Sequence, residues 1–363
     1  MRKYARVREA LRKEIVGGEF PAGSSIPTWD KLQHRFGVSR STIRLALQDL
    51  KEEGFLRPAG RNGTLVTEAP PHLCRYALVL PQENERTEGQ FSLFWQALEA
   101  EVRETVGRRH DGEGRVRIFY GVEEGAAAEE EFLDDIATHQ YAGLIFGRDS
   151  ALLHNPRVEQ AGVPRVYIGS HPDSRGIPAV YPDTHLFMNR ALDRLASVGC
   201  KRVAVLTVAS YRRYFGDCIK LARNRGFLIH PWWVHTMEPY SRDGAKSWAR
   251  LLMSLPEDER PDGLVITDDH LATPASQGLF NGGVADASDC HTVVLANFPR
   301  PPRCLVDVDY LGYDAATILE SALDAIDSLR AGEPAPSVTR IKPHFRREPP
   351  HEEIYGELTQ TDE

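Results

Sequence analysis

The sequence is 363 residues long, carries a formal net charge of −8, and contains 41% hydrophobic and 26% charged residues. These values are ordinary for soluble globular proteins and argue against wholesale disorder, a collagen-like chain and a coiled-coil rod. The length predicts two or three domains. Uncharged apolar stretches stay below the roughly 18 residues of a membrane span, and the charged N-terminus lacks the apolar centre of a signal peptide. We therefore expect a cytoplasmic protein without membrane contact.

Basic and acidic residues are unevenly distributed along the chain. Residues 1–70 contain 13 Lys and Arg against 8 Asp and Glu, which gives a net charge of +5 there and −13 in the remainder. A basic segment attached to an acidic one is typical of a region that meets a polyanion such as nucleic acid. Chance variation in surface charge explains the same numbers equally well, so charge alone leaves both interpretations open.

The five cysteines are an odd number and widely spaced, without a C-x-x-C pair. This pattern is untypical of zinc and redox sites, so we expect the thiols to be reduced and mostly buried. The sequence predicts no metal site and no cofactor.

Three helices are predicted in the first part of the chain. Apolar residues recur at three- and four-residue spacing from Tyr4 to Ile15, the pattern of an amphipathic helix. Thr28 and Ser39 are placed to cap the second and third helices. The apolar series of the third helix includes Leu45, and the helix is expected to end at Gly54. The spacing of the second and third helices predicts a helix-turn-helix.

A two-stranded wing is expected after the third helix. Residues 55–57 and 64–67 are strand-like, and they flank the basic, glycine-containing turn 59–63. The first 67 residues are therefore predicted to form a winged helix-turn-helix.

From residue 75 onward, short apolar runs alternate with longer helical patterns. The runs expected as strands are 76–80, 116–120, 143–146, 164–168, 203–206, 264–267 and 293–296. The helical candidates between them are 91–107, 126–139, 184–198, 212–226, 243–255 and 312–331. Such alternation predicts an α/β fold with parallel sheets covered on both faces, here two sheets side by side with a ligand cleft at the carboxyl ends of their strands.

These patterns define the predicted domains. We expect a winged helix-turn-helix in residues 1–67, a linker in 68–74 that contains a Pro-Pro pair, and an α/β body in 75–346. Residues 347–363 are rich in proline and acidic side chains and are predicted to form a disordered tail. We call residues 1–67 the N-terminal region and residues 75–346 the C-terminal region.

The N-terminal region closely resembles the GntR-family winged helix-turn-helix. The resemblance rests on Pro27-Thr28, on the series from Phe36-Gly37-Val38-Ser39 to Leu47, and on Gly60-Arg61-Asn62-Gly63-Thr64 in the wing. It implies that the following residues contact operator DNA: Thr28, Ser39, Arg40, Ser41, Thr42, Arg44, Arg61 and Gly63. The chain departs from the family at Trp29-Asp30, where relatives often carry a basic residue.

Physical arguments support the same positions. Ser39 to Thr42 begin the third helix, where free backbone N–H groups and the helix dipole favour phosphate. Arg40 and Arg44 lie four residues apart on one helical face, so both can enter a major groove and donate paired bonds to guanine. The competing interpretation is a pair of solvated surface arginines.

The C-terminal region resembles the ligand-binding domain of the LacI/GalR repressors, which is similar to periplasmic sugar-binding proteins. The resemblance rests on Asp183-Thr184-His185, on the stretch from Val198 to Leu206, on Pro261-Asp262-Gly263 and on Asp268-Asp269. It implies a two-lobed fold that binds a small-molecule effector, with Phe91, Arg213 and Asp269 as effector-binding residues. The alternatives for these residues are core packing for Phe91, a helix-start ion pair for Arg213 and a helix N-cap for Asp269.

The C-terminal region also departs from this family. Residues 295–298 read Leu-Ala-Asn-Phe where Gly-Phe-Asp is common, and Asp268 stands where Asn is usual. Trp232 and Trp233 are aromatic enough to stack on a sugar ring, and hinge packing or an interface is the competing interpretation.

The combined resemblance implies a homodimeric transcriptional regulator that binds operator DNA and a carbohydrate effector. An enzyme is disfavoured because the sequence has no Walker-type Gly-Lys-Ser/Thr, no His-Glu-x-x-His and no Gly-x-Ser-x-Gly. A secreted solute-binding protein is disfavoured by the N-terminal region. A further alternative keeps DNA binding but makes the C-terminal region a ligand-independent dimerisation scaffold.

Overall fold

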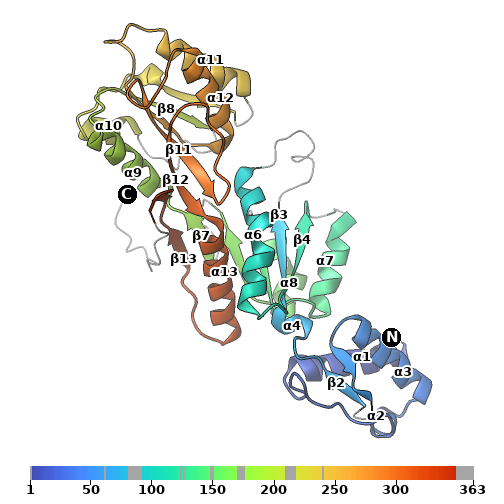
Figure 1. Cartoon of the computed structure of the whole chain (residues 1–363). Helices are drawn as coiled ribbons and strands as arrows, with labels where there is room; N and C mark the ends of the chain where they lie inside the picture. The colour runs from blue at the N-terminus through green and yellow to red at the C-terminus, as the bar shows by residue number, and fades with distance from the viewer. Residues whose placement is uncertain are drawn as a thin grey trace. The chain divides into compact units, whose positions relative to one another are not determined.

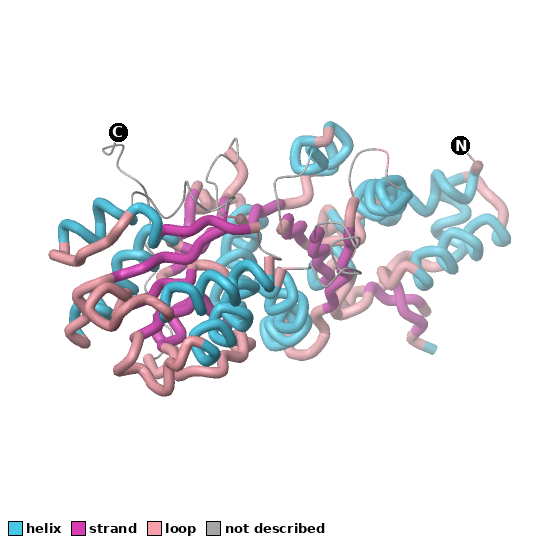
Figure 2. The backbone as a smooth tube through the Cα atoms, turned by 90° about the horizontal axis from the view of Figure 1, so that it is seen from above, coloured by secondary structure: helices cyan, strands magenta, loops and turns pink. Residues whose placement is uncertain are grey.

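The computed structural model forms two compact units (Figure 1). It describes residues 2–60, 63–80, 92–122, 125, 127–147, 151–169, 176–208, 218–238 and 241–348. The first unit contains residues 1–82, 102–167 and 326–334, and the second contains residues 83–101, 168–325 and 335–363. Figure 2 shows the helices, strands and loops along the described backbone.

The N-terminal region folds as the predicted three helices and wing. Its elements are α1 (Lys3–Val16), α2 (Trp29–Phe36), α3 (Arg40–Glu52), and the antiparallel strands β1 (Leu56–Pro58) and β2 (Thr64–Val66). One apolar core joins them, with Leu11, Leu32 and Leu47 each contributed by a different helix. Helix α2 ends at Gly37, whose positive φ of 60° is a left-handed conformation that favours glycine. The predicted winged helix-turn-helix is thereby confirmed.

The third helix runs through Leu45 as predicted, but this residue lies outside the core. This side chain is 49% exposed, whereas Ile43 and Leu47 on either side of it are buried. Successive residues of an α-helix are separated by about 100°, so Leu45 points away from the arc that faces the core. It shares the solvent face of α3 with Arg44, which is also exposed.

The segment between the two regions contains one helical turn, α4 (Pro71–Cys74), which runs directly into the first strand of the α/β fold. Pro71 occupies the first turn, where a missing N–H costs nothing. The His72 ring stacks on Phe55 at a centroid distance of 5.8 Å. Burial lowers the pKa of His72 to about 4, so its ring is neutral at physiological pH.

The first unit contains a parallel sheet whose strands lie in the order β4-β3-β5-β6. The strands are β3 (Arg75–Leu80), β4 (Arg115–Tyr120), β5 (Gly143–Phe146) and β6 (Arg165–Ile168). The intervening helices are α6 (Leu93–Arg109), α7 (Ala127–Ala137), the short η2 (Ala151–His154) and α8 (Pro156–Ala161). Gly143 is required in β5 because a Cβ there would lie 2.5 Å from Cγ2 of Ile326.

The second unit contains a six-stranded sheet in the order β14-β12-β11-β10-β8-β9. Its strands are β8 (Val203–Val208), β9 (Val234–Met237), β10 (Gly263–Ile266), β11 (His291–Phe298), β12 (Asp309–Asp314) and β14 (His344–Phe345). All neighbours are parallel except β14, which runs antiparallel to β12. A parallel pair, β7 (Ala179–Pro182) and β13 (Val338–Ile341), also lies in this unit.

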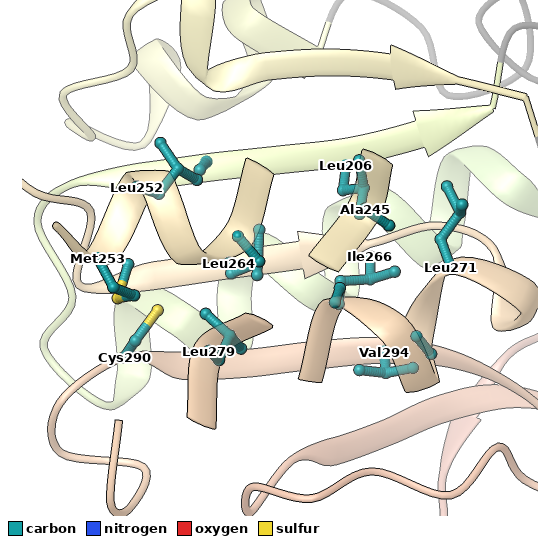
Figure 3. Close-up of a cluster of buried hydrophobic side chains, with 14 of the residues drawn as sticks. Leu206, Ala245, Leu252, Met253, Leu264, Ile266, Leu271, Leu279, Cys290 and Val294 are labelled. Atoms are coloured by element: carbon teal, nitrogen blue, oxygen red, sulfur yellow. The ribbon is translucent and has the colours of Figure 1, made fainter. Parts of the chain in front are cut away.

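Helices cover both faces of the six-stranded sheet. They include α9 (Thr184–Ser197), α11 (Arg242–Met253) and α12 (Asp269–Asn281), and the second unit also contains α10 (Cys218–Asn224) and η4 (Pro231–Trp233). Helix α13 (Ala315–Arg330) is divided between the two units after residue 325, and its Ile326 lies against Gly143 of β5. All six residues of β8 are buried. Its alternate residues, including Leu206, pack with Ala245 of α11 and Leu271 of α12 in one core cluster (Figure 3). The remaining β8 residues point to the opposite face, so that face is covered too.

The α/β fold with parallel sheets is confirmed, and each predicted strand overlaps an observed one. The strands β7, β9, β12, β13 and β14 were not predicted, nor were the helices α8 and α12, of which α12 contains Pro274. Predicted helix 212–226 is described only from residue 218, and the predicted tail is described only to residue 348.

The five cysteines are free thiols. Two of them, Cys74 and Cys290, are buried, whereas Cys200, Cys218 and Cys304 are half-buried. The expectation that most are buried is therefore wrong.

Candidate DNA-binding and effector sites

The start of α3 concentrates hydroxyl groups on its exposed end. Ser39 is the N-cap, and its Oγ accepts a hydrogen bond from the Thr42 backbone N–H at 3.3 Å. The same Oγ lies 2.9 Å from Ser41 Oγ and 2.9 Å from Thr42 Oγ1. This network fixes the first turn of the helix, where backbone N–H groups point outward and favour an anion.

Thr28 occupies the corresponding position before α2 but does not cap it through its side chain. The prediction that Thr28 caps the second helix is therefore correct for its position only. Its side chain is exposed, as are those of Ser39 and Ser41.

Two arginines project from the solvent face of α3. Arg40 and Arg44 are both exposed, and neither forms an ion pair within the described part of the chain. Other arginines of the N-terminal region are held by acids: Arg8 by Asp49 at 3.0 Å and Arg12 by Glu53 at 2.6 Å. The structure thus leaves uncompensated positive charge on the face that begins with the hydroxyl network.

Arg40 has one notable neighbour, the Trp29 side chain at the start of α2. The Arg40 Cζ lies 5.5 Å from the centre of the indole ring, within cation–π range. Trp29 is half-buried and packs against the core of the N-terminal region. The sequence analysis identified Trp29 only as a departure from the expected basic residue.

The wing places Gly63 at its tip. Gly63 adopts a positive φ of 82°, which permits its carbonyl to accept from the Ala59 N–H at 2.9 Å. Arg61, the predicted wing contact, lies outside the described residues.

A small polar and aromatic pocket lies within the second unit. Its volume is about 110 Å³. The residues that give it its chemistry are Phe94, Trp95, Thr184, Asp269, Asn297 and Tyr313. Asp269 follows the carboxyl end of β10 and Asn297 lies near the end of β11, the edge at which ligands bind in parallel sheets.

Asp269 and Asn297 form the polar centre of this pocket. The Asn297 Nδ2 donates to Asp269 Oδ2 at 2.6 Å, and each residue is 4% exposed. Burial raises the pKa of Asp269 to about 6, while the hydrogen bond from Asn297 acts in the opposite direction. The pair presents carboxylate and amide groups suited to hydroxyl-bearing ligands.

The alternative role of Asp269 as a helix N-cap is taken by the preceding residue, Asp268. Asp268 caps α12, with its Oδ1 accepting from the His270 N–H at 2.9 Å. Burial and the neighbouring Asp269 charge raise the pKa of Asp268 well above its ordinary value. Burial lowers the pKa of His270 to about 4, and its neutral ring accepts from the Leu93 N–H at 3.3 Å.

Phe91 and Arg213, the other predicted effector contacts, lie outside the described residues. The structure brings Phe94 and Trp95 to the pocket instead, with ring centres 4.7 Å apart. Two consecutive aromatic residues near the start of a predicted helix were the only signal in the sequence from which Phe94 and Trp95 could have been proposed as pocket residues.

The two tryptophans considered as a stacking surface for a sugar, Trp232 and Trp233, differ in exposure. Trp233 is 2% exposed and belongs to the core of the second unit, whereas Trp232 is 68% exposed and stacks on His230 at 4.4 Å. Neither tryptophan lines the pocket of Asp269.

Comparison with known proteins identifies both regions. Residues 3–66 match the model of the bacterial regulatory proteins of the gntR family. The chain is 22% identical over 317 residues to the arabinose metabolism transcriptional repressor of Geobacillus stearothermophilus, covering 82% of each chain. A structure of a LacI family transcriptional regulator from Lactobacillus casei with bound glucose resembles the chain with a TM-score of 0.53 and 16% identity, covering 75% of this chain and 97% of that one.

The N-terminal region thus matches the gntR-family model, and the C-terminal region has the fold of LacI-family structures. The N-terminal match extends to the mannosyl-D-glycerate transport/metabolism system repressor MngR of Escherichia coli (strain K12), 40% identical over 65 residues, which are 18% of this chain and 27% of that one. The structural likeness establishes the periplasmic-binding-protein-like fold of the body. Among the described residues, no helix is long and apolar enough to cross a membrane.

Proposed function

We propose that this regulator is a cytoplasmic homodimeric repressor, without catalytic activity, that binds operator DNA and is controlled by a carbohydrate effector. The observation that carries the proposal is the solvent face of α3, where Arg40 and Arg44 are exposed beside the capped first turn. Two such faces in a dimer match the two halves of a pseudo-palindromic operator.

On the DNA, Arg40 and Arg44 contact base edges, while Ser39, Ser41 and Thr42 contact phosphate at the helix start. Thr28 adds a phosphate contact, and Arg61 and Gly63 bring the wing to the adjacent groove. The described members of this set other than Thr42, which is half-buried, are exposed, and their exposure supports the assignment.

The effector occupies the pocket of Asp269 and Asn297. Sugars present hydroxyl groups to polar side chains and apolar ring faces to aromatic ones, and the pocket offers both kinds of partner. We include Phe91 and Arg213 in this site, as the family resemblance implies. The glucose bound to the LacI family structure supports a carbohydrate as the ligand class.

Effector binding changes operator affinity only to the extent that the effector prefers one of two conformations of the dimer. Two relatives of this chain are named as repressors, which supports repression as the regulatory action. The rival, a C-terminal region that serves only as a dimerisation scaffold, predicts no effector response at all.

Arg40→Ala tests the DNA assignment. The loss of a paired contact to guanine should weaken binding of the full chain to an operator fragment by about 1 to 3 kcal/mol. Arg108→Ala is the matched control, because Arg108 is exposed on α6 and paired with Glu104. Equal affinities for the wild type and Arg40→Ala would remove α3 from the interface.

Thermal denaturation with saturating sugars tests the effector assignment. A sugar at 100 times its Kd stabilises the folded state by about 2.7 kcal/mol, which raises the melting temperature by several degrees. Arg213→Ala should abolish this shift while leaving operator binding intact. A shift that persists in Arg213→Ala would remove Arg213 from the pocket, and the absence of a shift with every sugar would favour the scaffold.

A further inference from the structure

The contact between Trp29 and Arg40 joins the two helices of the helix-turn-helix. Trp29 is the first residue of α2, and Arg40 is the first residue of α3. The Arg40 Cζ lies 5.5 Å from the centre of the Trp29 ring. Trp29 is anchored against the apolar core, so the indole presents a fixed surface beside a side chain that is otherwise exposed to solvent.

The indole is well suited to restrict the Arg40 side chain. A guanidinium within about 6 Å of an aromatic centre is attracted by the ring quadrupole, and Trp gives the strongest such attraction. An unrestrained arginine has many accessible rotamers, and part of this freedom is lost whenever the guanidinium docks on a base. A ring that holds Arg40 before DNA arrives reduces that loss.

Arg44 provides an internal comparison. It lies on the same face of α3 and is exposed like Arg40, yet within the described part of the chain no aromatic ring lies under its guanidinium. The two arginines therefore differ in preorganisation although they share a helix, a charge and a degree of exposure.

We propose that Trp29 is a positioning residue that orients the Arg40 guanidinium for contact with a guanine of the operator. This inference rests on the proposed DNA-binding function and adds a determinant of base specificity to it. Trp29 acts through Arg40, so its contribution to affinity depends on Arg40 and on the base that Arg40 contacts.

The test is a double-mutant cycle on the full chain, measured as the Kd for a selected operator fragment. Trp29→Leu keeps an apolar side chain against the core and removes the ring, and it should weaken binding by about two- to five-fold. Trp29→Phe retains a weaker ring and should lose less. In the Arg40→Ala background, Trp29→Leu should have no further effect.

The same substitution in the Arg44→Ala background is the matched control. There Trp29→Leu should again weaken binding two- to five-fold, because Arg40 is still present. Replacing the guanine that Arg40 contacts by adenine should likewise erase the difference between wild type and Trp29→Leu. A loss that persists without Arg40 would overturn the proposal and indicate that Trp29 contacts DNA itself.

Stability and function are separated by two further measurements. Melting temperatures of all variants show whether the fold is retained, and if Trp29→Leu unfolds, the cycle is completed with Trp29→Phe. An operator-binding wild type whose affinity is unchanged in both Trp29 variants would refute the positioning role alone. A wild type that binds no fragment specifically would refute the proposed function, and the positioning role with it.

Discussion

The two regions of this protein present their candidate ligand contacts in opposite ways. Arg40 and Arg44 of the N-terminal region are exposed on one helix, four residues apart, and make no ion pair among the described residues. Asp269 and Asn297 of the C-terminal region are 4% exposed and come from the ends of two different strands. Exposed side chains contribute little to the free energy of folding, whereas buried side chains contribute substantially to it. Substitutions should therefore separate binding from stability in the first region and change both in the second.

The largest expected effect distinguishes the two faces of α3. Leu47→Ala removes a side chain that is 1% exposed and should destabilise the N-terminal region by about 2 to 5 kcal/mol. Leu45→Ala, at a position 49% exposed, should cost less than about 1 kcal/mol. Urea denaturation of the full chain measures both. Similar losses would show that Leu45 belongs to the core after all.

The buried acid of the pocket formed by Asp269 and Asn297 predicts a pH-dependent stability. The pKa of Asp269 is raised from 3.8 to about 6 by burial, so the folded state binds more protons than the unfolded state between these values. The stability contribution of Asp269 is thus greatest below pH 3.8 and is lost as the pH rises through about 6. Asp268 shifts in the same direction.

Asp269→Asn removes this titration. It should stabilise the protein at pH 7 on the order of 1 to 3 kcal/mol and have little effect near pH 4, as followed by melting temperature across that range. Asp286→Asn is the control of opposite sign, because hydrogen bonds from Ser288 lower the pKa of Asp286. Destabilisation of Asp269→Asn at pH 7 would show that the charged carboxylate is stabilised where it lies.

The smallest expected effect compares two helix starts. Ser39→Ala removes the side-chain cap of α3 and should cost about 0.5 to 2 kcal/mol of stability. Thr28→Ala should lower the free energy of unfolding by only about a few tenths of a kcal/mol, because the Thr28 side chain makes no cap hydrogen bond. Urea denaturation of the two variants tests the difference. A larger loss at Thr28 would contradict the observed capping.

The same contrast explains how much could be predicted from the sequence. The signals of the N-terminal region are local: Gly37 ends one helix, Ser39 caps the next, and apolar residues repeat at helical spacing. Each depends on neighbours within a few residues, so the helices and the wing follow from the sequence. Leu45 shows the limit of such signals, because its side chain is apolar although its helical angle faces solvent.

The C-terminal region depends on contacts between distant residues. The pairing of β7 with β13 joins residues near 180 to residues near 340, and neither strand has a long apolar run that predicts it. Helix α12 was missed because Pro274 interrupts its pattern. Asp269 could be predicted from its place after a strand, but its partner Asn297 could not, since it is 28 residues away on the next strand of the sheet.

Selection of genomic fragments tests the central claim most directly. The full chain is incubated with sheared DNA from its own source at near-physiological salt, and the bound fragments are sequenced beside those bound by Arg40→Ala. The account predicts a few strongly enriched sites that share an inverted repeat and are lost in the variant. Only a salt-sensitive background without enriched sites, or the same sites recovered by Arg40→Ala, would contradict it.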